Sequence, residues 1–217
     1  MYNEGLIFVL TGPSGSGKTT NWKEICKKRK DTAEPSIVYT TRLKRNGENS
    51  GEQYYFITDN EFDKMVHENK FVCYTTFCGK KYGLSKEYVN KVISQDKKDL
   101  IFDSIMPVED VKSISKNVIV IYLTTTTDEE LKNRIIARVN GNITKEEIES
   151  RMKDAKKQKE EVLPQSDYVV VTDNTRTKEA IVDEIMYRID NVKIEYEKNK
   201  NIYPNKLAQF FSKNYIN

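Results

Sequence analysis

Cysteine is scarce in this chain, which has only three, Cys26, Cys73 and Cys78, among its 217 residues. Their number is odd, and no two of them have the CxxC spacing that is typical of zinc sites and redox motifs. We therefore expect free thiols in a reducing compartment, and the sequence indicates neither a disulfide framework nor a zinc site.

Long apolar runs are missing as well. The longest, such as VIVIYL at 118–123, are far shorter than the roughly 20 residues that a membrane-spanning helix requires. No basic segment precedes the first apolar residues, so the start of the chain does not have the pattern of a secretory signal. We expect a soluble, cytoplasmic protein with no membrane partner.

The chain also lacks an excess of one charge. Its 36 Lys and Arg residues against 33 Asp and Glu give a net charge of +3, which is too small to indicate a nucleic-acid-binding surface. Histidine occurs once, at His67, on the opposite side of a predicted helix from Phe62, Met65 and Val66, so we expect it at the surface. We expect small-molecule partners, with the chain a monomer or a homodimer.

What the sequence does contain is an alternation of apolar runs and helical patterns. Apolar runs at 6–10, 100–102, 118–123 and 168–171 predict buried strands. Strands that are apolar almost throughout and are separated by helices are typical of a parallel sheet covered on both faces, so we predict a three-layer α/β/α fold. The helices are predicted at 18–29, 60–69, 86–95, 108–115, 128–139, 145–162 and 178–196.

Two of these helices begin with the spelling of a capping box, in which a Thr and a Glu three residues later satisfy two backbone amides. The pairs are Thr127 with Glu130, and Thr144 with Glu147. Residues 40–58 interrupt the alternation with spaced aromatic residues and a polar turn, which predicts a small, mainly β insertion.

The segment GPSGSGKT at 12–19 matches the phosphate-loop pattern G-x-x-x-x-G-K-[ST] and lies between a predicted strand and a predicted helix. Its glycines let the backbone N–H groups point at phosphate oxygens, and the helix N-terminus adds positive potential. Lys18 is expected to bridge the outer phosphates, and the Thr19 hydroxyl to bind Mg²⁺. The alternative, a glycine-rich turn that binds nothing, is disfavoured by the complete motif. The predicted ATP-binding residues are Gly12, Ser14, Gly15, Ser16, Gly17, Lys18, Thr19 and Thr20.

The stretch TTRLKRNGENSGEQYYF at 40–56 offers a second set of phosphate-binding donors. Arg42 and Arg45 are three residues apart in an extended or turn segment, so their planar forks can reach one phosphate, and Tyr54 can add a neutral donor. The same side chains could instead be exposed charges on a loop, and the residues alone leave both interpretations open.

Together with GPSGSGKTT, EFDKMVHENKFV and GKKYG, this stretch resembles the guanylate kinase family in order and spacing, from about Leu6 to Arg188. The phosphate loop is generic, whereas the second segment is quite specific. The resemblance implies a P-loop NTPase fold with a small β-rich nucleotide-binding insertion and a helical lid. It also implies transfer of the γ-phosphoryl group of ATP, with Mg²⁺, to GMP or dGMP, giving GDP or dGDP.

The resemblance assigns roles to individual residues of the acceptor site. Asp103, at the end of a predicted strand, matches the family's acidic residue near the acceptor and the metal, so Thr19 and Asp103 are the expected metal ligands. An aspartate that caps the next turn is the alternative for Asp103. The acceptor phosphate is expected on Arg42, Arg45, Tyr54 and Tyr82.

The chain departs from the family at three positions that bind the guanine base. At these positions the family usually has two Ser or Thr residues and a Glu. Here those positions hold Val38, Cys73 and Leu84, and Ile105 replaces a second aspartate after Asp103. A carboxylate paired with the guanine edge can discriminate on the order of 10⁴-fold, whereas apolar contacts give only about 10 to 200-fold. A different acceptor, such as a pyrimidine or modified nucleotide or a phosphorylated sugar, is therefore the alternative within the enzyme class.

Residues 128–151 are predicted to form a helical hairpin that carries three arginines. Arg134 and Arg138 are four residues apart and share a helix face, while the spacing before Arg151 is two residues longer than in the family. The resemblance places these arginines on a lid that closes over the nucleotides, with a solvated basic face as the alternative. The expected catalytic set is Lys18, Arg42, Arg134, Arg138 and Arg151.

The resemblance also divides the chain into parts. Residues 197–217 are expected to be a C-terminal extension, in which Leu207, Phe210 and Phe211 share one face of a short helix. The other expected parts are a P-loop core at 1–37, 97–127 and 152–196, an acceptor-binding subdomain at 38–96 and a lid at 128–151.

A non-catalytic guanylate kinase-like interaction module is the remaining alternative, although such modules typically lack the working phosphate loop that this chain has.

Overall fold

The computed structural model describes residues 6–199 except 46, 53, 78, 94–98, 104–105, 114 and 116. Cys78, Ile105 and the predicted helix with Leu207, Phe210 and Phe211 therefore lie outside the described residues. The helices are α1 Lys18–Lys28, α2 Asp59–His67, α3 Lys86–Ile93, α4 Val108–Lys112, α5 Asp128–Ala137, α6 Lys145–Glu161 and α7 Lys178–Asn199. The strands are β1 Ile7–Thr11, β2 Ala33–Pro35, β3 Val38–Thr40, β4 Tyr54–Phe56, β5 Phe71–Phe77, β6 Lys80–Ser85, β7 Asp99–Asp103, β8 Val118–Thr124 and β9 Tyr168–Val171.

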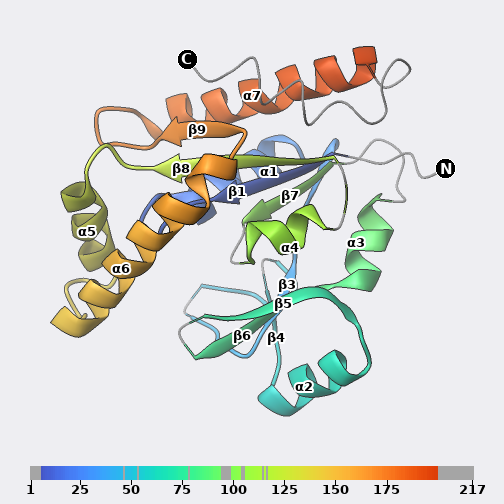
Figure 1. Cartoon of the computed structure of the whole chain (residues 1–217), viewed down its shortest axis with the longest axis horizontal. Helices are drawn as coiled ribbons and strands as arrows, with labels where there is room; N and C mark the ends of the chain where they lie inside the picture. The colour runs from blue at the N-terminus through green and yellow to red at the C-terminus, as the bar shows by residue number, and fades with distance from the viewer. Residues whose placement is uncertain are drawn as a thin grey trace. The chain divides into compact units, whose positions relative to one another are not determined.

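The strands form two sheets, one of order β2-β7-β1-β8-β9 and one of order β4-β3-β6-β5 (Figure 1). Each predicted strand and helix is present, with ends that differ by a few residues. The prediction of an α/β fold with a parallel sheet is confirmed, because β2 pairs with β7 and β8 pairs with β9 in parallel. Of residues 40–58, which were predicted to be a mainly β insertion, only Thr40 and β4 are strand among those described, and β5 and β6 further along the chain complete the second sheet. Strands β2, β5 and β6 were not predicted.

The chain divides into two compact units, which we describe in turn. One comprises Met1–Ile7 and Arg29–Val118, and the other comprises Phe8–Lys28 and Ile119–Asn217. The predicted division into a core, an acceptor-binding subdomain, a lid and a C-terminal extension stays a prediction.

In the first unit the second sheet packs one face against helix α2. A register shift in β5 sets Phe71 opposite Ser85 and Cys73 opposite Leu84, so Phe71 and Cys73 lie on opposite faces of the sheet. Phe62 of α2 stacks on Phe71, with ring centroids 4.7 Å apart. A Cβ on Gly83 of β6 would lie 2.6 Å from a Phe71 ring carbon, so this position requires glycine. The aromatic cluster therefore fixes α2 on the sheet.

In the second unit β1 and β8 are buried along almost their whole length, as expected for central strands of a parallel sheet. Helices α5 and α6 pack on each other through Leu131, Ile135 and Ala155. Ion pairs at α1 and α7 join Lys28 to Asp183 and Lys178 to Glu24. These exposed pairs add little stability, so apolar burial accounts for most of the packing.

The two predicted capping boxes have different outcomes. Thr144 and Glu147 form the complete box at the start of α6. At the start of α5 the Thr127 side chain accepts from the Glu130 amide, as predicted, but the prediction was wrong for the second half of the box. The Glu130 carboxylate instead accepts hydrogen bonds from Arg134 and from the backbone of Asn174. The carboxylate that would complete the local capping box is therefore used in hydrogen bonds with Arg134 and Asn174.

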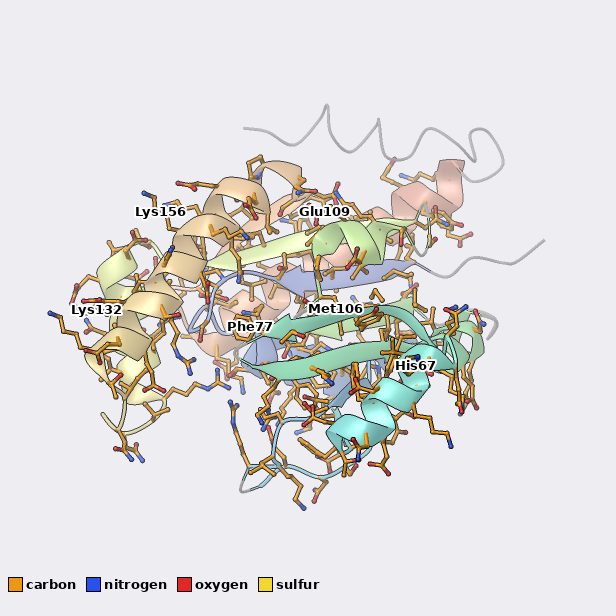
Figure 2. All side chains as sticks on the ribbon, turned by 60° about the horizontal axis from the view of Figure 1, so that its bottom comes forward. His67, Phe77, Met106, Glu109, Lys132 and Lys156 are labelled. Carbon is orange, nitrogen blue, oxygen red and sulfur yellow. The ribbon has the colours of Figure 1, made fainter. Side chains whose placement is uncertain are left out.

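His67 lies at the end of α2 and is exposed, as predicted (Figure 2). Among the described residues, no helix combines the length and the apolar character needed to cross a membrane.

Candidate active site

The predicted phosphate loop has the expected setting, because residues 12–17 join β1 to the start of α1. Gly12 has a φ of +132°, and a Cβ there would lie 2.1 Å from the carbonyl oxygen of Leu123, so no other residue fits. The amide of Ser16 donates to the carbonyl of Pro13 at 3.1 Å, which closes the loop. This curled backbone at a helix N-terminus is suited to an anion.

Lys18, in the first turn of α1, folds back over this loop. Its ammonium donates to the carbonyl oxygen of Pro13 at 2.9 Å and also to that of Gly12. These acceptors are neutral, so a phosphate oxygen can replace them with a stronger, charge-assisted hydrogen bond. The structure thus places the ammonium at the loop, where a triphosphate can take it over.

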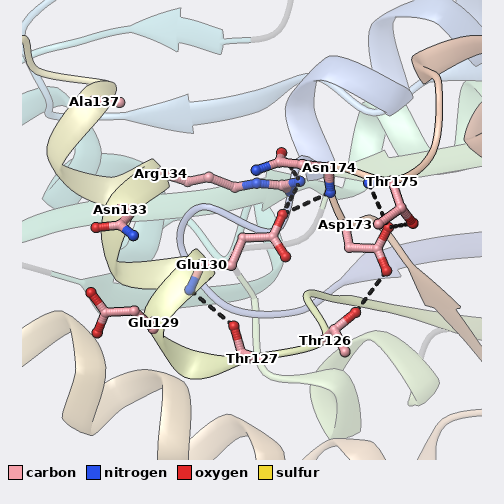
Figure 3. Close-up of a pocket in the computed structure, with 10 residues that line it drawn as sticks. All are labelled: Thr126, Thr127, Glu129, Glu130, Asn133, Arg134, Ala137, Asp173, Asn174 and Thr175. Carbon is pink, nitrogen blue, oxygen red and sulfur yellow. Dashed lines mark hydrogen bonds and ion pairs between the residues drawn. The ribbon is translucent and has the colours of Figure 1, made fainter.

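Arg134 of α5 is held by side chains from two segments (Figure 3). Its Nη2 donates to Glu130 Oε1 at 2.8 Å and to Asn174 Oδ1 at 2.9 Å. Glu130 Oε1 also accepts from the backbone amide of Asn174 at 2.8 Å, so one carboxylate links the helix to the segment that follows β9. The Arg134–Glu130 pair is mostly buried, with side-chain exposures of 24% and 15%. Arg134 is therefore a fixed group.

Thr172 connects Arg134 to the phosphate loop. Its hydroxyl donates to the carbonyl oxygen of Ser16 at 2.8 Å and accepts from Arg134 Nη1 at 3.2 Å. Thr172 is buried, and the Ser16 hydroxyl is also buried, with no hydrogen-bond partner among the described residues. The segment after β9 therefore lies directly against the loop that holds Lys18.

A pocket of about 660 Å³ opens beside Arg134 (Figure 3). Asp173 shapes one side, since its carboxylate accepts from the Thr126 and Thr175 hydroxyls, and from the Thr175 amide. The lining combines hydrogen-bonding side chains with the flat guanidinium of Arg134, which suits a planar, polar ring. It is lined by Thr126, Thr127, Glu129, Glu130, Asn133, Arg134, Ala137, Asp173, Asn174 and Thr175.

The other two predicted lid arginines lie in different surroundings. Arg151 of α6 donates from Nη1 to the hydroxyl of Ser14 at 3.3 Å, which brings it to the phosphate loop. Arg138 follows the last residue of α5 and its side chain is exposed. Of the three arginines, Arg134 and Arg151 thus make hydrogen bonds that link them to the phosphate loop, Arg134 through Thr172 and Arg151 through Ser14.

In the first unit, predicted acceptor residues gather around Tyr54. The guanidinium carbon of Arg42 lies 5.1 Å from the Tyr54 ring centroid, and the Tyr82 and Tyr54 centroids are 6.2 Å apart. Burial, and then the negative charge of Asp103, raise the pKa of Tyr54 well above its ordinary value, so its hydroxyl stays protonated and can donate. Arg45, on the loop after Arg42, has an exposed side chain.

The three positions at which the family reads its base form one row across the second sheet. Val38 of β3 and Cys73 of β5 both lie directly opposite Leu84 of β6, so the three side chains share a face. All three are buried, with Leu84 fully enclosed. Burial, followed by the charge of Asp110, raises the pKa of Cys73 to about 12, so the thiol is neutral at ordinary pH. The row is apolar and uncharged.

The next row on the same face contains Tyr82, which is part of the cluster around Tyr54. Tyr82 lies two residues before Leu84 and pairs with Thr40 and Thr75. Two residues of strand span about 6.6 Å, so an apolar row and an arginine–tyrosine cluster are neighbours on one surface. The first unit thus combines an arginine–tyrosine cluster with an adjoining apolar row.

Comparison with known proteins decides the family. The sequence model of the family described as guanylate kinase matches residues 5–188. The chain belongs to the guanylate kinase family. It is 38% identical over 178 residues to the guanylate kinase of Bacillus subtilis (strain 168), covering 82% of this chain and 85% of that protein. It is 34% identical over 203 residues to that of Enterococcus faecalis (strain ATCC 700802 / V583), covering 91% and 98%.

The crystal structure of guanylate kinase from Anaplasma phagocytophilum is similar in fold, with a TM-score of 0.65 at 21% identity, covering 87% of this chain and 86% of that one. The predicted family and fold class are therefore confirmed. Membership of the guanylate kinase family makes the chain a kinase, a transferase that binds nucleotides, as the motifs predicted.

Most of the pocket beside Arg134 was not predicted from the sequence of this guanylate kinase family member. Glu130 was read only as a capping residue, and Asp173, Asn174 and Thr175 were not assigned a role. One signal was present, because these three residues follow a predicted strand, and ligands of open α/β sheets bind outside the carboxyl ends of strands. The order of residues along the chain does not show which side chains of α5 and of the segment after β9 contact each other.

Proposed function

We propose that this guanylate kinase family protein transfers the γ-phosphoryl group of ATP to GMP or dGMP, giving GDP or dGDP. The observation that carries the proposal is the intact phosphate loop between β1 and α1, with Lys18 held over it. The arginine–tyrosine cluster of the first unit supports a separate site for the acceptor phosphate. In this proposal residues 38–96 bind the acceptor, 128–151 act as the lid, and the remaining parts of 1–196 form the core.

The triphosphate of ATP is proposed to lie on residues 12–19, and its base in the pocket beside Arg134. The contacts of Arg134 with Glu130 and Asn174 favour a role in the wall of this pocket, whereas the family resemblance assigned it to the transferred phosphoryl group. Arg138 and Arg151 remain for that role, because a cation is needed where charge gathers on the equatorial oxygens. The Arg151 contact with Ser14 supports this assignment.

Mg²⁺ is proposed to bind with ATP. The hydroxyl of Thr19 and the carboxylate of Asp103 are the hard oxygen donors that this ion prefers, and the ion neutralises phosphate charge when bound. No protein general base is required, because phosphoryl transfer through a loose transition state depends on positioning and on charge stabilisation. Lys18 and the lid arginines supply these from the chain itself.

Replacing Arg134 with methionine is expected to raise KM for ATP by roughly 10-fold and to leave KM for the acceptor within about 2-fold. The change removes the flat cation from the pocket while retaining an unbranched apolar stem. Steady-state kinetics with each substrate varied in turn measures the split. Lys132→Met, on the same helix, is the matched control, because Lys132 extends away from α5 (Figure 2). Equal effects on both KM values would contradict the donor-side placement.

A specific observation favours a second acceptor. Because the Val38, Cys73 and Leu84 row is buried and apolar, it offers no side-chain partner for the polar edge of guanine. The alternative acceptors are a pyrimidine or modified nucleotide, or a phosphorylated sugar. A coupled assay of ATP with each candidate acceptor decides between them, and turnover with none of them would reject the kinase proposal in favour of an interaction module.

Replacing Arg45 with alanine is expected to lower kcat/KM for the acceptor by roughly 10 to 100-fold, as for the loss of a charge-assisted hydrogen bond, with KM for ATP unchanged. Arg42→Ala is expected to have at least the same effect. Lys44→Ala, an exposed lysine between the two, is the control. If the arginine variants lost ATP binding and kept acceptor binding, the two sites would have to be exchanged.

A further inference from the structure

The loop that carries Arg42 also contains an acidic residue, Glu48. Glu48 forms a two-pronged pair with Arg42, in which Nη1 donates to Oε2 at 3.0 Å and Nη2 donates to Oε1 at 2.8 Å. The pair is mostly buried, with side-chain exposures of 13% for Arg42 and 19% for Glu48. A carboxylate thus lies against an arginine that is assigned to phosphate.

The geometry of the guanidinium shows which donors this pairing uses. Arginine has five N–H donors in one plane. The Glu48 carboxylate accepts one N–H from Nη1 and one from Nη2, and these two donors form the end edge of the guanidinium. The carbonyl oxygen of Leu43 also accepts from Nη1, at 2.8 Å. The donors that these contacts do not use are Nε–H and the second Nη2–H, which point in parallel from the side edge. This edge matches two oxygens of a phosphate.

Aromatic rings restrict the other approaches to Arg42. The guanidinium carbon lies over the Tyr54 ring, 5.1 Å from its centroid, and over the Phe56 ring, 5.4 Å from its centroid. The two rings occupy space around the cation that an anion would otherwise use. Tyr54, which lies against the cation, also packs beside the Tyr82 ring and lies near enough to Asp103 to be affected by its charge.

Glu48 also holds the second arginine of the loop. Its Oε2 accepts from the backbone amide of Arg45 at 2.8 Å, and its own amide donates to the Arg45 carbonyl at 3.2 Å. Burial alone would raise the pKa of Glu48, but the hydrogen bonds from Arg42 and Arg45 outweigh this effect and lower it. The carboxylate stays charged at neutral pH and ties both arginines into one turn.

We propose that Glu48 is a positioning residue of the acceptor site, which occupies the end edge of Arg42 so that the side edge, Nε–H and Nη2–H, is presented to the acceptor phosphate. This inference rests on the proposed function, because it needs Arg42 to bind that phosphate. The contrary role is that Glu48 competes with phosphate for the same donors. The two roles predict opposite signs when the carboxylate is removed, since losing a positioner weakens acceptor binding and losing a competitor strengthens it.

The first test is the variant Glu48→Gln, compared with Glu52→Gln as the control. Glu52 is on the same loop, where its carboxylate accepts from the Asn49 side chain. We expect Glu48→Gln to raise Kd and KM for the acceptor monophosphate by about 10-fold, with KM for ATP within about 2-fold, and Glu52→Gln to change neither. Tighter acceptor binding, or equal effects on both substrates, would overturn the proposal.

The second test asks whether Glu48 acts through the guanidinium. Lysine cannot form the two-pronged pair or present two parallel donors, so in an Arg42→Lys background the change Glu48→Gln should add less than about 2-fold to Kd for the acceptor. Thermal unfolding of each variant checks the fold. A full effect of Glu48→Gln in the lysine background would show that it only holds the loop, and would overturn the proposal.

Binding is measured by calorimetry with GMP and CMP in the absence of ATP, so that it does not depend on turnover. If wild-type protein turns over no acceptor but binds a monophosphate in a Glu48-dependent manner, the proposed function fails while Glu48 keeps its positioning role. If turnover is normal and binding is insensitive to Glu48, the proposed function stands and this inference fails.

Discussion

Replacing Lys18 with alanine is expected to lower kcat/KM for phosphoryl transfer by at least about 100-fold, with no loss of the fold. Lys18 is the cation of the phosphate loop, and its ammonium donates to the carbonyl oxygens of Gly12 and Pro13. Alanine removes that charge, and its high helix propensity suits the first turn of α1. A coupled assay with saturating acceptor measures the loss.

The control for this variant is Lys23→Ala, which removes an exposed lysine from the same helix. Circular dichroism and thermal unfolding establish that both variants are folded. Turnover by Lys18→Ala within about 3-fold of wild type, under conditions where Lys23→Ala is normal, would be incompatible with the proposed kinase mechanism.

The second large effect is expected at the apolar row. With Val38, Cys73 and Leu84 buried side by side, wild-type protein is expected to discriminate between GMP and at least one other monophosphate by no more than about 200-fold in kcat/KM. Apolar contacts distinguish shapes to that extent, whereas a paired carboxylate achieves far more. A panel of purine and pyrimidine monophosphates measures the ratio.

Restoring hydrogen-bonding groups with Cys73→Glu and Leu84→Ser is expected to shift the preference toward GMP by about 10-fold or more. The new carboxylate accepts from the guanine edge, and the serine removes the apolar neighbour that lies directly opposite it. Both positions are buried, so the variant is also expected to unfold at a lower temperature in the absence of ligand. Added GMP should recover part of that stability, because it binds only the folded state.

Thr76→Glu is the matched control for this variant, since it adds the same charge to an exposed position of the same strand. We expect no change in its preference. A wild-type preference for GMP far above every other monophosphate would refute the idea of an apolar base site, and would direct attention to Ser36, to Thr75 or to backbone carbonyls as readers of the base.

Much of this protein was predictable from its sequence because the signals are local. The phosphate loop occupies eight consecutive residues, 12–19, and its chemistry depends on backbone curvature that the glycines allow. The helices and strands β1, β7, β8 and β9 followed from hydrophobic periodicity, and the capping box at Thr144 formed as its sequence pattern predicts. The positions of Val38, Cys73 and Leu84 were known from the family pattern, although not that they form one buried row.

Tertiary structure decided how charged side chains are used. Glu130 has the spelling of a capping residue, yet its carboxylate bonds Arg134 and the backbone of Asn174, 44 residues further along the chain. Glu48 is one of two acidic residues in the stretch 40–56, and only the folded turn brings it against the end edge of Arg42. A carboxylate accepts from whichever donors the fold brings within hydrogen-bond distance, and partners that are buried together outcompete local ones that water can replace. Sequence by itself therefore determined the fold and the kind of chemistry, whereas the fold determined which partner holds each arginine and hence which of its donors face a ligand.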